Sequence, residues 1–191
     1  MCPEAEPPRI TLLLGGARSG KSELAELIAG SSAPPVTYVA TGWGGDPDMA
    51  ARIERHRARR PPQWATLEVS PRAAGAGQAP RAGGPDLPAL LAATAGTVLV
   101  DSLGTWVAAA PGLTVDAGAL CDALIARPGR SILVSDEVGL GVHPETGLGR
   151  AFRDALGELN RAVATVADEA LLVVAGRVLR LEQFGELTGA G

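Results

Sequence analysis

The chain has 191 residues, a net charge of −4 and two cysteines. This length is enough for one domain with a substantial core, and the acidic balance argues against general nucleic-acid binding. Two cysteines are too few for a disulfide framework, and no apolar run reaches the length of a membrane span. We therefore expect a cytoplasmic protein that has neither nucleic acid nor a membrane as a partner.

The first predicted element is a strand at residues 9–14, an apolar run that leads directly into a glycine-rich octet. Residues 15–22, Gly-Gly-Ala-Arg-Ser-Gly-Lys-Ser, match the G-x-x-x-x-G-K-[ST] pattern of a phosphate-binding loop. A helix is predicted over residues 22–29, with Leu24, Leu27 and Ile28 on one face and Gly30 placed to end it. Strand, loop and helix in this order are the context that the motif requires.

The octet contains Lys21, the only lysine of the chain, whereas every other cationic residue apart from the two histidines is arginine. Glycines let the backbone turn tightly, so that successive N–H groups can point at phosphate oxygens. The compact lysine ammonium can reach the β- and γ-phosphates, and the Ser22 hydroxyl can ligate Mg²⁺. A planar arginine would serve this role less well.

Further along the chain, apolar runs alternate with amphipathic stretches. Strands are predicted at residues 36–41, 66–69, 97–101, 131–135 and 170–175, and helices at 46–60, 87–94, 116–126 and 148–167. This alternation predicts an α/β fold with a mainly parallel sheet flanked by helices. We expect a single nucleotide-binding domain over residues 9–181, with frayed ends at 1–8 and 186–191.

One stretch breaks this pattern. Residues 70–88 are rich in alanine, glycine and proline and lack apolar periodicity. Such a segment buries little apolar surface, so we predict a mobile surface loop. A functional lid is the alternative, because long loops are often functional.

The predicted helix at residues 46–60 carries five arginines between residues 52 and 60, together with His56. Arg52 and Arg60 each lie about one turn, roughly 5.4 Å, from His56 along the axis of such a helix. Nearby cations disfavour imidazolium, so they would keep His56 neutral and nucleophilic, and they would attract a polyphosphate. The alternative is a solvated arginine-rich helix with a bystander histidine.

Carboxylates follow several of the predicted strands. Asp101 ends the strand at 97–101 and resembles the acidic strand end that organises Mg²⁺ in phosphate-loop enzymes, although it could equally cap a turn. Glu68 lies near the end of another strand. Asp136 and Glu137 follow the strand at 131–135, where ligands gather in open α/β sheets. Glu137 is therefore a candidate for positioning water or metal, or else an ordinary loop charge.

Four sequence blocks together resemble one family, the bifunctional adenosylcobinamide kinase/adenosylcobinamide-phosphate guanylyltransferases. The blocks are residues 15–22, residues 38–41 (Tyr-Val-Ala-Thr), residues 49–61 with the pattern Arg-Ile-x-x-His-Arg-x-x-Arg-Pro, and residues 136–145 running into 149–160. They are spread over most of residues 9–181. The family often has Asn where this chain has Asp136, and residues 70–96 have no convincing match.

The resemblance implies a RecA-like phosphate-loop fold and a two-step transferase. Such an enzyme phosphorylates adenosylcobinamide from ATP or GTP, then transfers GMP from GTP to adenosylcobinamide phosphate through a GMP-histidine. Lys21 and His56 match the catalytic positions, Ser22 and Asp101 would hold Mg²⁺, and a homotrimer is implied. The implied nucleotide-contacting residues are Gly15, Gly16, Ala17, Arg18, Ser19, Gly20, Lys21, Ser22, Ala40, Thr41, Gly42, Arg57, Ala58, Arg59, Arg60, Glu68 and Asp101.

Two other functions remain possible from the residues themselves. A simple phosphate-loop kinase of a small hydroxylated metabolite would use His56 only to bind phosphate. A regulatory GTP-binding switch is disfavoured, because an Asn-Lys-x-Asp guanine-reading motif needs a second lysine and the chain has none.

Overall fold

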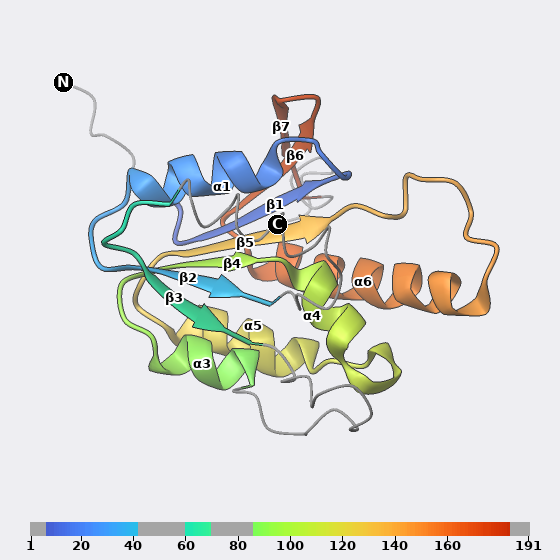
Figure 1. The fold of residues 1–191 in the computed structure, drawn as a ribbon, viewed down its shortest axis with the longest axis horizontal. Helices are drawn as coiled ribbons and strands as arrows, with labels where there is room; N and C mark the ends of the chain where they lie inside the picture. The colour runs from blue at the N-terminus through green and yellow to red at the C-terminus, as the bar shows by residue number, and fades with distance from the viewer. Residues whose placement is uncertain (1–6, 42–59, 70–85, 184–191) are drawn as a thin grey trace.

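A seven-stranded sheet with the strand order β3-β2-β4-β5-β1-β6-β7 organises the protein (Figure 1). The computed structural model describes residues 7–41, 60–69 and 86–183. The strands are β1 (Ile10–Gly15), β2 (Val36–Ala40), β3 (Ala65–Glu68), β4 (Thr97–Asp101), β5 (Ser131–Asp136), β6 (Glu169–Val174) and β7 (Arg177–Leu181). The helices are α1 (Lys21–Gly30), α3 (Leu87–Ala93), α4 (Leu103–Ala109), α5 (Ala117–Ala126) and α6 (Gly147–Val166), with a 3₁₀ turn at Pro111–Leu113.

Within the described part of the chain, every strand pair is parallel except β6 with β7. The strand that leads into the phosphate loop, β1, is separated from β4, the strand that ends in Asp101, by β5. This insertion of one strand between the two, with helices on both faces, is the arrangement of RecA-like phosphate-loop proteins. The predicted fold class is confirmed.

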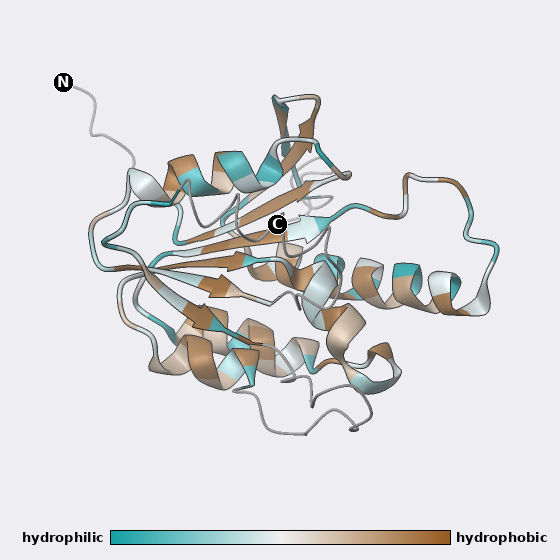
Figure 2. Cartoon of the chain, viewed as in Figure 1, coloured by the Kyte–Doolittle hydropathy of each residue, from teal (hydrophilic) through white to brown (hydrophobic). Residues whose placement is uncertain are grey.

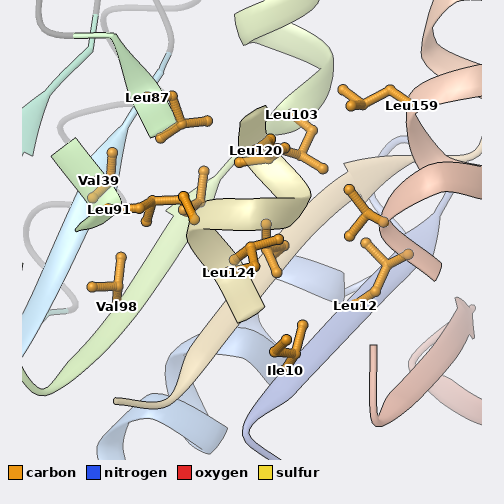
Figure 3. Packing of buried hydrophobic residues seen from close by; sticks show 14 of the residues in the cluster. Ile10, Leu12, Val39, Leu87, Leu91, Val98, Leu103, Leu120, Leu124 and Leu159 are labelled. Carbon is orange, nitrogen blue, oxygen red and sulfur yellow. The ribbon is translucent and has the colours of Figure 1, made fainter. Parts of the chain in front are cut away.

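Strands β1, β2, β4 and β5 are buried on both faces, as parallel strands covered by helices are. Strands β3 and β7, at the two ends of the sheet, are exposed. Along β1, Ile10, Leu12 and Leu14 belong to one apolar cluster, and Leu13 belongs to a second cluster on the opposite face. The first cluster is completed by α3, α4, α5 and α6, and Figure 3 shows the leucines of these helices meeting the strands. The second is completed by α1. In Figure 2 the strands are mostly brown, whereas α1 and α6 carry teal on parts of their surface.

The packing of α1 differs from the predicted apolar face. Its buried apolar positions are Ala25 and Ala29, whereas Leu27 is 68 % exposed. Leu24 and Ile28 are only partly buried against the core. Small side chains on the inner face let a helix lie close to a sheet, and this is why the alanines rather than Leu27 occupy the contact.

Two elements were not predicted from the sequence. Helix α4 begins immediately after β4, where the Ser102 side chain accepts from the Thr105 N–H and the Thr105 side chain accepts from the Ser102 N–H. This reciprocal cap uses Thr in place of the usual Glu or Gln, so the standard signature is absent. Strand β7 pairs with β6 across Ala175 and Gly176, which both have positive φ, as a tight hairpin turn requires.

The predicted loop at residues 70–88 is wrong at its end. Leu87 and Pro88 lie in α3 and are buried, because Leu87 enters the apolar cluster at the first turn of the helix. Four stretches lie outside the described residues: 1–6, 42–59, 70–85 and 184–191. The second of these holds most of the arginine-rich helix that the sequence predicts. No helix in the described ranges is both long and apolar enough to cross a membrane.

Candidate active site

The carboxyl ends of the parallel strands bring most of the predicted site residues to one edge of the sheet. The register pairs Gly15 on β1 with Asp136 on β5. It also pairs Ala40 on β2 with Asp101 on β4 and with Glu68 on β3. Segments that are distant in the sequence therefore meet at the edge where α/β proteins bind their ligands.

The phosphate loop connects β1 to α1 in a conformation that requires glycine at two positions. A Cβ atom on Gly15 would lie 2.5 Å from the carbonyl oxygen of Val173. Gly20 has φ of 99°, in the left-handed region that favours glycine. The loop is braced by the β6–β7 turn, where the Gly176 N–H donates to the Ser19 carbonyl at 2.9 Å.

Lys21, the first residue of α1, is directed into the site rather than to solvent. Its side chain is only 4 % exposed, and Nζ lies 2.8 Å from Oδ1 of Asp136. Nζ also donates to the Gly16 carbonyl at 3.1 Å. The ammonium is thereby held beside the loop whose backbone would surround a phosphate, as the motif predicts.

The two predicted metal ligands are neighbours. The Ser22 hydroxyl donates to Oδ1 of Asp101 at 3.4 Å. Hydroxyl and carboxylate oxygens are donors that Mg²⁺ prefers, so this pair fits the ion chemically. Across the described residues, no three His, Cys, Asp or Glu side chains group around a possible metal.

Tyr38 joins Asp101 to Arg60. Its hydroxyl donates to Oδ2 of Asp101 at 3.0 Å, and the Arg60 guanidinium lies 3.4 Å from the centroid of its ring. Burial, and next the charge of Asp101, raise the pKa of Tyr38, so the hydroxyl remains protonated and acts as a donor. Tyr38 is the central residue of β2, and its sequence context as part of an apolar run carries no signal of this role.

Thr41 follows β2 and is fully buried. Its hydroxyl hydrogen-bonds the Ser102 carbonyl at 2.5 Å and the Thr105 hydroxyl at 2.6 Å. The side chain of this predicted nucleotide contact thus supports the start of α4. Glu68, at the end of β3, is exposed at the same edge of the sheet.

Asp136 is the acid that contacts Lys21 beside the phosphate loop, while Glu137 stays a candidate for positioning water or metal. The Glu137 carboxylate accepts from the Gly139 N–H at 2.7 Å, within its own turn, whereas Asp136 contacts Lys21. The end of β5 is fixed by Asn160 of α6, whose Nδ2 donates to the Asp136 carbonyl at 3.1 Å. The sequence signal for Asp136 is its place directly after the apolar run of residues 131–135, but only the strand order shows that β5 lies next to β1.

His56, the predicted nucleophile, lies outside the described residues, as do Gly42, Arg57, Ala58 and Arg59. Arg60, the last residue of the same sequence block, is described and lies at the site through its contact with Tyr38.

Comparison with known proteins gives the family. The model of the cobinamide kinase / cobinamide phosphate guanyltransferase family (CobU) matches residues 11–181. The chain belongs to this family.

Relatives of the family support the assignment over nearly full length. The chain is 40 % identical over 184 residues to the bifunctional adenosylcobalamin biosynthesis protein CobP of Pseudomonas aeruginosa, covering 90 % of this chain and 96 % of the relative. It is 41 % identical over 175 residues to the protein CobU of Salmonella typhimurium, covering 86 % of this chain and 95 % of the relative.

Among solved structures, the flagellar accessory protein FlaH of Methanocaldococcus jannaschii superposes with a TM-score of 0.45 at 13 % identity, covering 90 % of this chain and 76 % of FlaH.

Proposed function

We propose that the protein phosphorylates adenosylcobinamide with ATP or GTP and then transfers GMP from GTP to the resulting phosphate, giving adenosylcobinamide-GDP. Family membership and the relatives at about 40 % identity support this pair of activities. The observation that carries the proposal is the phosphate loop whose Lys21 is directed into the site beside the Ser22–Asp101 pair. A homotrimer, from the family resemblance, and a cytoplasmic location, from the low cysteine count of the sequence, are part of the same proposal.

The kinase step needs positioning and charge neutralisation more than covalent chemistry from the protein. The loop amides and Lys21 would hold the β- and γ-phosphates, and Ser22 and Asp101 would hold Mg²⁺. When bound, the ion would offset phosphate charge as the γ-phosphoryl group moves to the acceptor hydroxyl. Tyr38 keeps the Asp101 carboxylate in a fixed orientation by donating to its second oxygen.

The guanylyl transfer is assigned to His56. A neutral imidazole nitrogen attacks the α-phosphorus of GTP, an N–P bond forms, and the bond to the β-phosphate oxygen breaks to release pyrophosphate. An oxygen of adenosylcobinamide phosphate then attacks the same phosphorus and displaces the imidazole. The position of Arg60 supports this assignment, because Arg60 contacts Tyr38 in the site. His56 precedes Arg60 by four residues, and four residues of chain span at most about 14 Å.

The covalent intermediate can be tested by labelling. Wild type, His56→Ala and His143→Ala are incubated with α-labelled GTP and Mg²⁺, and label retained after denaturation is measured. We expect label in wild type and His143→Ala and none in His56→Ala, because His143 is the only other histidine. The adduct should be acid-labile and base-stable, as a phosphoramidate is.

Two outcomes would contradict the proposal in different ways. Label that persists in His56→Ala would assign the nucleophile elsewhere. No label in any protein, together with transfer from γ-labelled ATP to adenosylcobinamide, would indicate a simple kinase.

A further inference from the structure

The ion pair with Asp136 occupies the Lys21 ammonium, which a bound triphosphate would need as a hydrogen-bond donor. Lysine has three N–H donors. In the structure one donates to the Gly16 carbonyl and another is directed at Oδ1 of Asp136, 2.8 Å away. An ammonium that bridges a β- and a γ-phosphate oxygen needs two donors for the phosphates. One of the present partners must therefore be released when a triphosphate binds.

Asp136 is the partner whose release favours binding most. The Gly16 carbonyl is neutral, whereas the Asp136 carboxylate is negative and repels the incoming phosphates. Its side chain is 34 % exposed, so the freed carboxylate has access to water, while Lys21 at 4 % has little. A buried ammonium without a counter-ion is costly, and this gives the pair a role when nucleotide is absent.

The surroundings hold the carboxylate in this place. Gly104 of α4 leaves space for the Asp136 carboxylate, because a Cβ atom on residue 104 would lie 2.8 Å from Oδ2 of Asp136. The backbone beneath is fixed twice: Asn160 donates to the Asp136 carbonyl, and the Glu137 N–H donates to the Gly15 carbonyl at 3.0 Å. Residues of α4, α6, β1 and β5 thus fix the position of Asp136, rather than one flexible contact.

We propose that Asp136 is an internal counter-ion that neutralises Lys21 in the nucleotide-free enzyme and is displaced from it by the triphosphate. The carboxylate competes with the β- and γ-phosphates for one ammonium, so it weakens triphosphate binding and stabilises the empty site. The inference rests on the proposed function only in requiring that the loop binds a nucleoside triphosphate.

The test compares binding of GTP, GDP and guanosine, each with Mg²⁺, to wild type and Asp136→Asn by calorimetry. Asn is isosteric and its amide oxygen can still accept from Lys21, so the variant removes charge while it keeps shape. We expect GTP to bind about tenfold tighter to Asp136→Asn, since one close like-charge repulsion is lost. The gain should be smaller for GDP and absent for guanosine. Asp154→Asn is the matched control, because Asp154 is paired with Arg153 at the surface and its side chain is 61 % exposed.

A second measurement separates this role from simple structural support. Without nucleotide, Asp136→Asn should melt at a lower temperature than wild type, and the difference should shrink when both are saturated with GTP and Mg²⁺. Equal or weaker GTP binding by Asp136→Asn, or an equal change for all three ligands, would overturn the competition. No GTP binding by wild type would overturn the phosphate-loop function itself, which the labelling experiment tests separately.

Discussion

At the scale of single residues, the site depends on side chains that hold one another in place. Asp101 shows this most clearly, since one carboxylate oxygen accepts from Ser22 and the other from Tyr38. A carboxylate that is fixed at both oxygens presents its lone pairs in one direction, which a metal ligand requires. The ring of Tyr38 in turn supports Arg60.

Tyr38→Phe is predicted to weaken the metal site without disturbing the stack. Phenylalanine keeps the ring beneath Arg60 but cannot donate to Asp101. Hydrogen bonds to charged groups contribute about 1.5–3 kcal/mol, so the apparent Mg²⁺ requirement of the kinase reaction should rise about tenfold. Mg²⁺ titrations of initial rate would measure this, with thermal unfolding as the control. An unchanged Mg²⁺ requirement in a folded variant would remove Tyr38 from the positioning of Asp101.

At the scale of elements, the edge of the sheet opposite the site is held by Arg127, which follows α5. Its guanidinium is buried and donates to the carbonyls of Thr94 and Gly96, before β4, and to those of Gly129 and Arg130, before β5. One side chain thereby joins the two connections that lead into β4 and β5. Burial lowers the pKa of Arg127, and its hydrogen bonds to these carbonyls offset part of the cost of burying the charge.

Arg127→Met is predicted to destabilise the fold while leaving the chemistry intact. The loss removes the guanidinium donor from four half-buried carbonyls, of which that of Arg130 keeps the Val98 N–H as a donor. Each buried polar group left unsatisfied costs about 1–3 kcal/mol, so the free energy of unfolding should fall by several kcal/mol. Denaturant unfolding measures the difference. Arg161→Met is the control, because Arg161 lies exposed on α6 and should change stability by less than about 0.5 kcal/mol. Loss of guanylyl labelling in a still-folded Arg127→Met would show that this edge also affects the site.

At the scale of the whole molecule, the active edge gathers the phosphate loop and the ends of β2, β4 and β5, while α5 and α6 cover the first apolar cluster behind it. The connection between β3 and α3 is flanked by Val69 and Leu87, which are both buried in the first apolar cluster. We therefore expect the fold not to depend on the composition of this connection.

Replacing residues 75–84 with a short Gly/Ser linker is predicted to leave cooperative folding intact. Loop closure changes by only about 0.6 kcal/mol for each doubling of loop length. Thermal unfolding and turnover should both be measured on the same preparation. Collapse of cooperative melting would place the segment in the core, whereas normal melting with lost turnover would reveal a lid.

Much of the fold was predictable because its signals are local. Six of the seven strands coincide with apolar runs, and α1 follows the loop as predicted. Strand β7 was missed because its five residues are all exposed and carry no burial pattern. Helix α4 was missed because its cap uses Thr105 and its first turn includes Gly104, a poor helix former.

The sequence alone determined the chemistry of the phosphate loop, because backbone turn, lysine and hydroxyl must be contiguous for phosphate to be bound by one segment. It also determined the α/β class, through apolar runs that alternate with helices. The tertiary structure alone decided that Asp136 rather than Glu137 contacts Lys21, and that Tyr38 and Arg60 support Asp101. These contacts depend on which strands are neighbours and in what register, and strand pairing is set by packing between distant segments that no local pattern encodes.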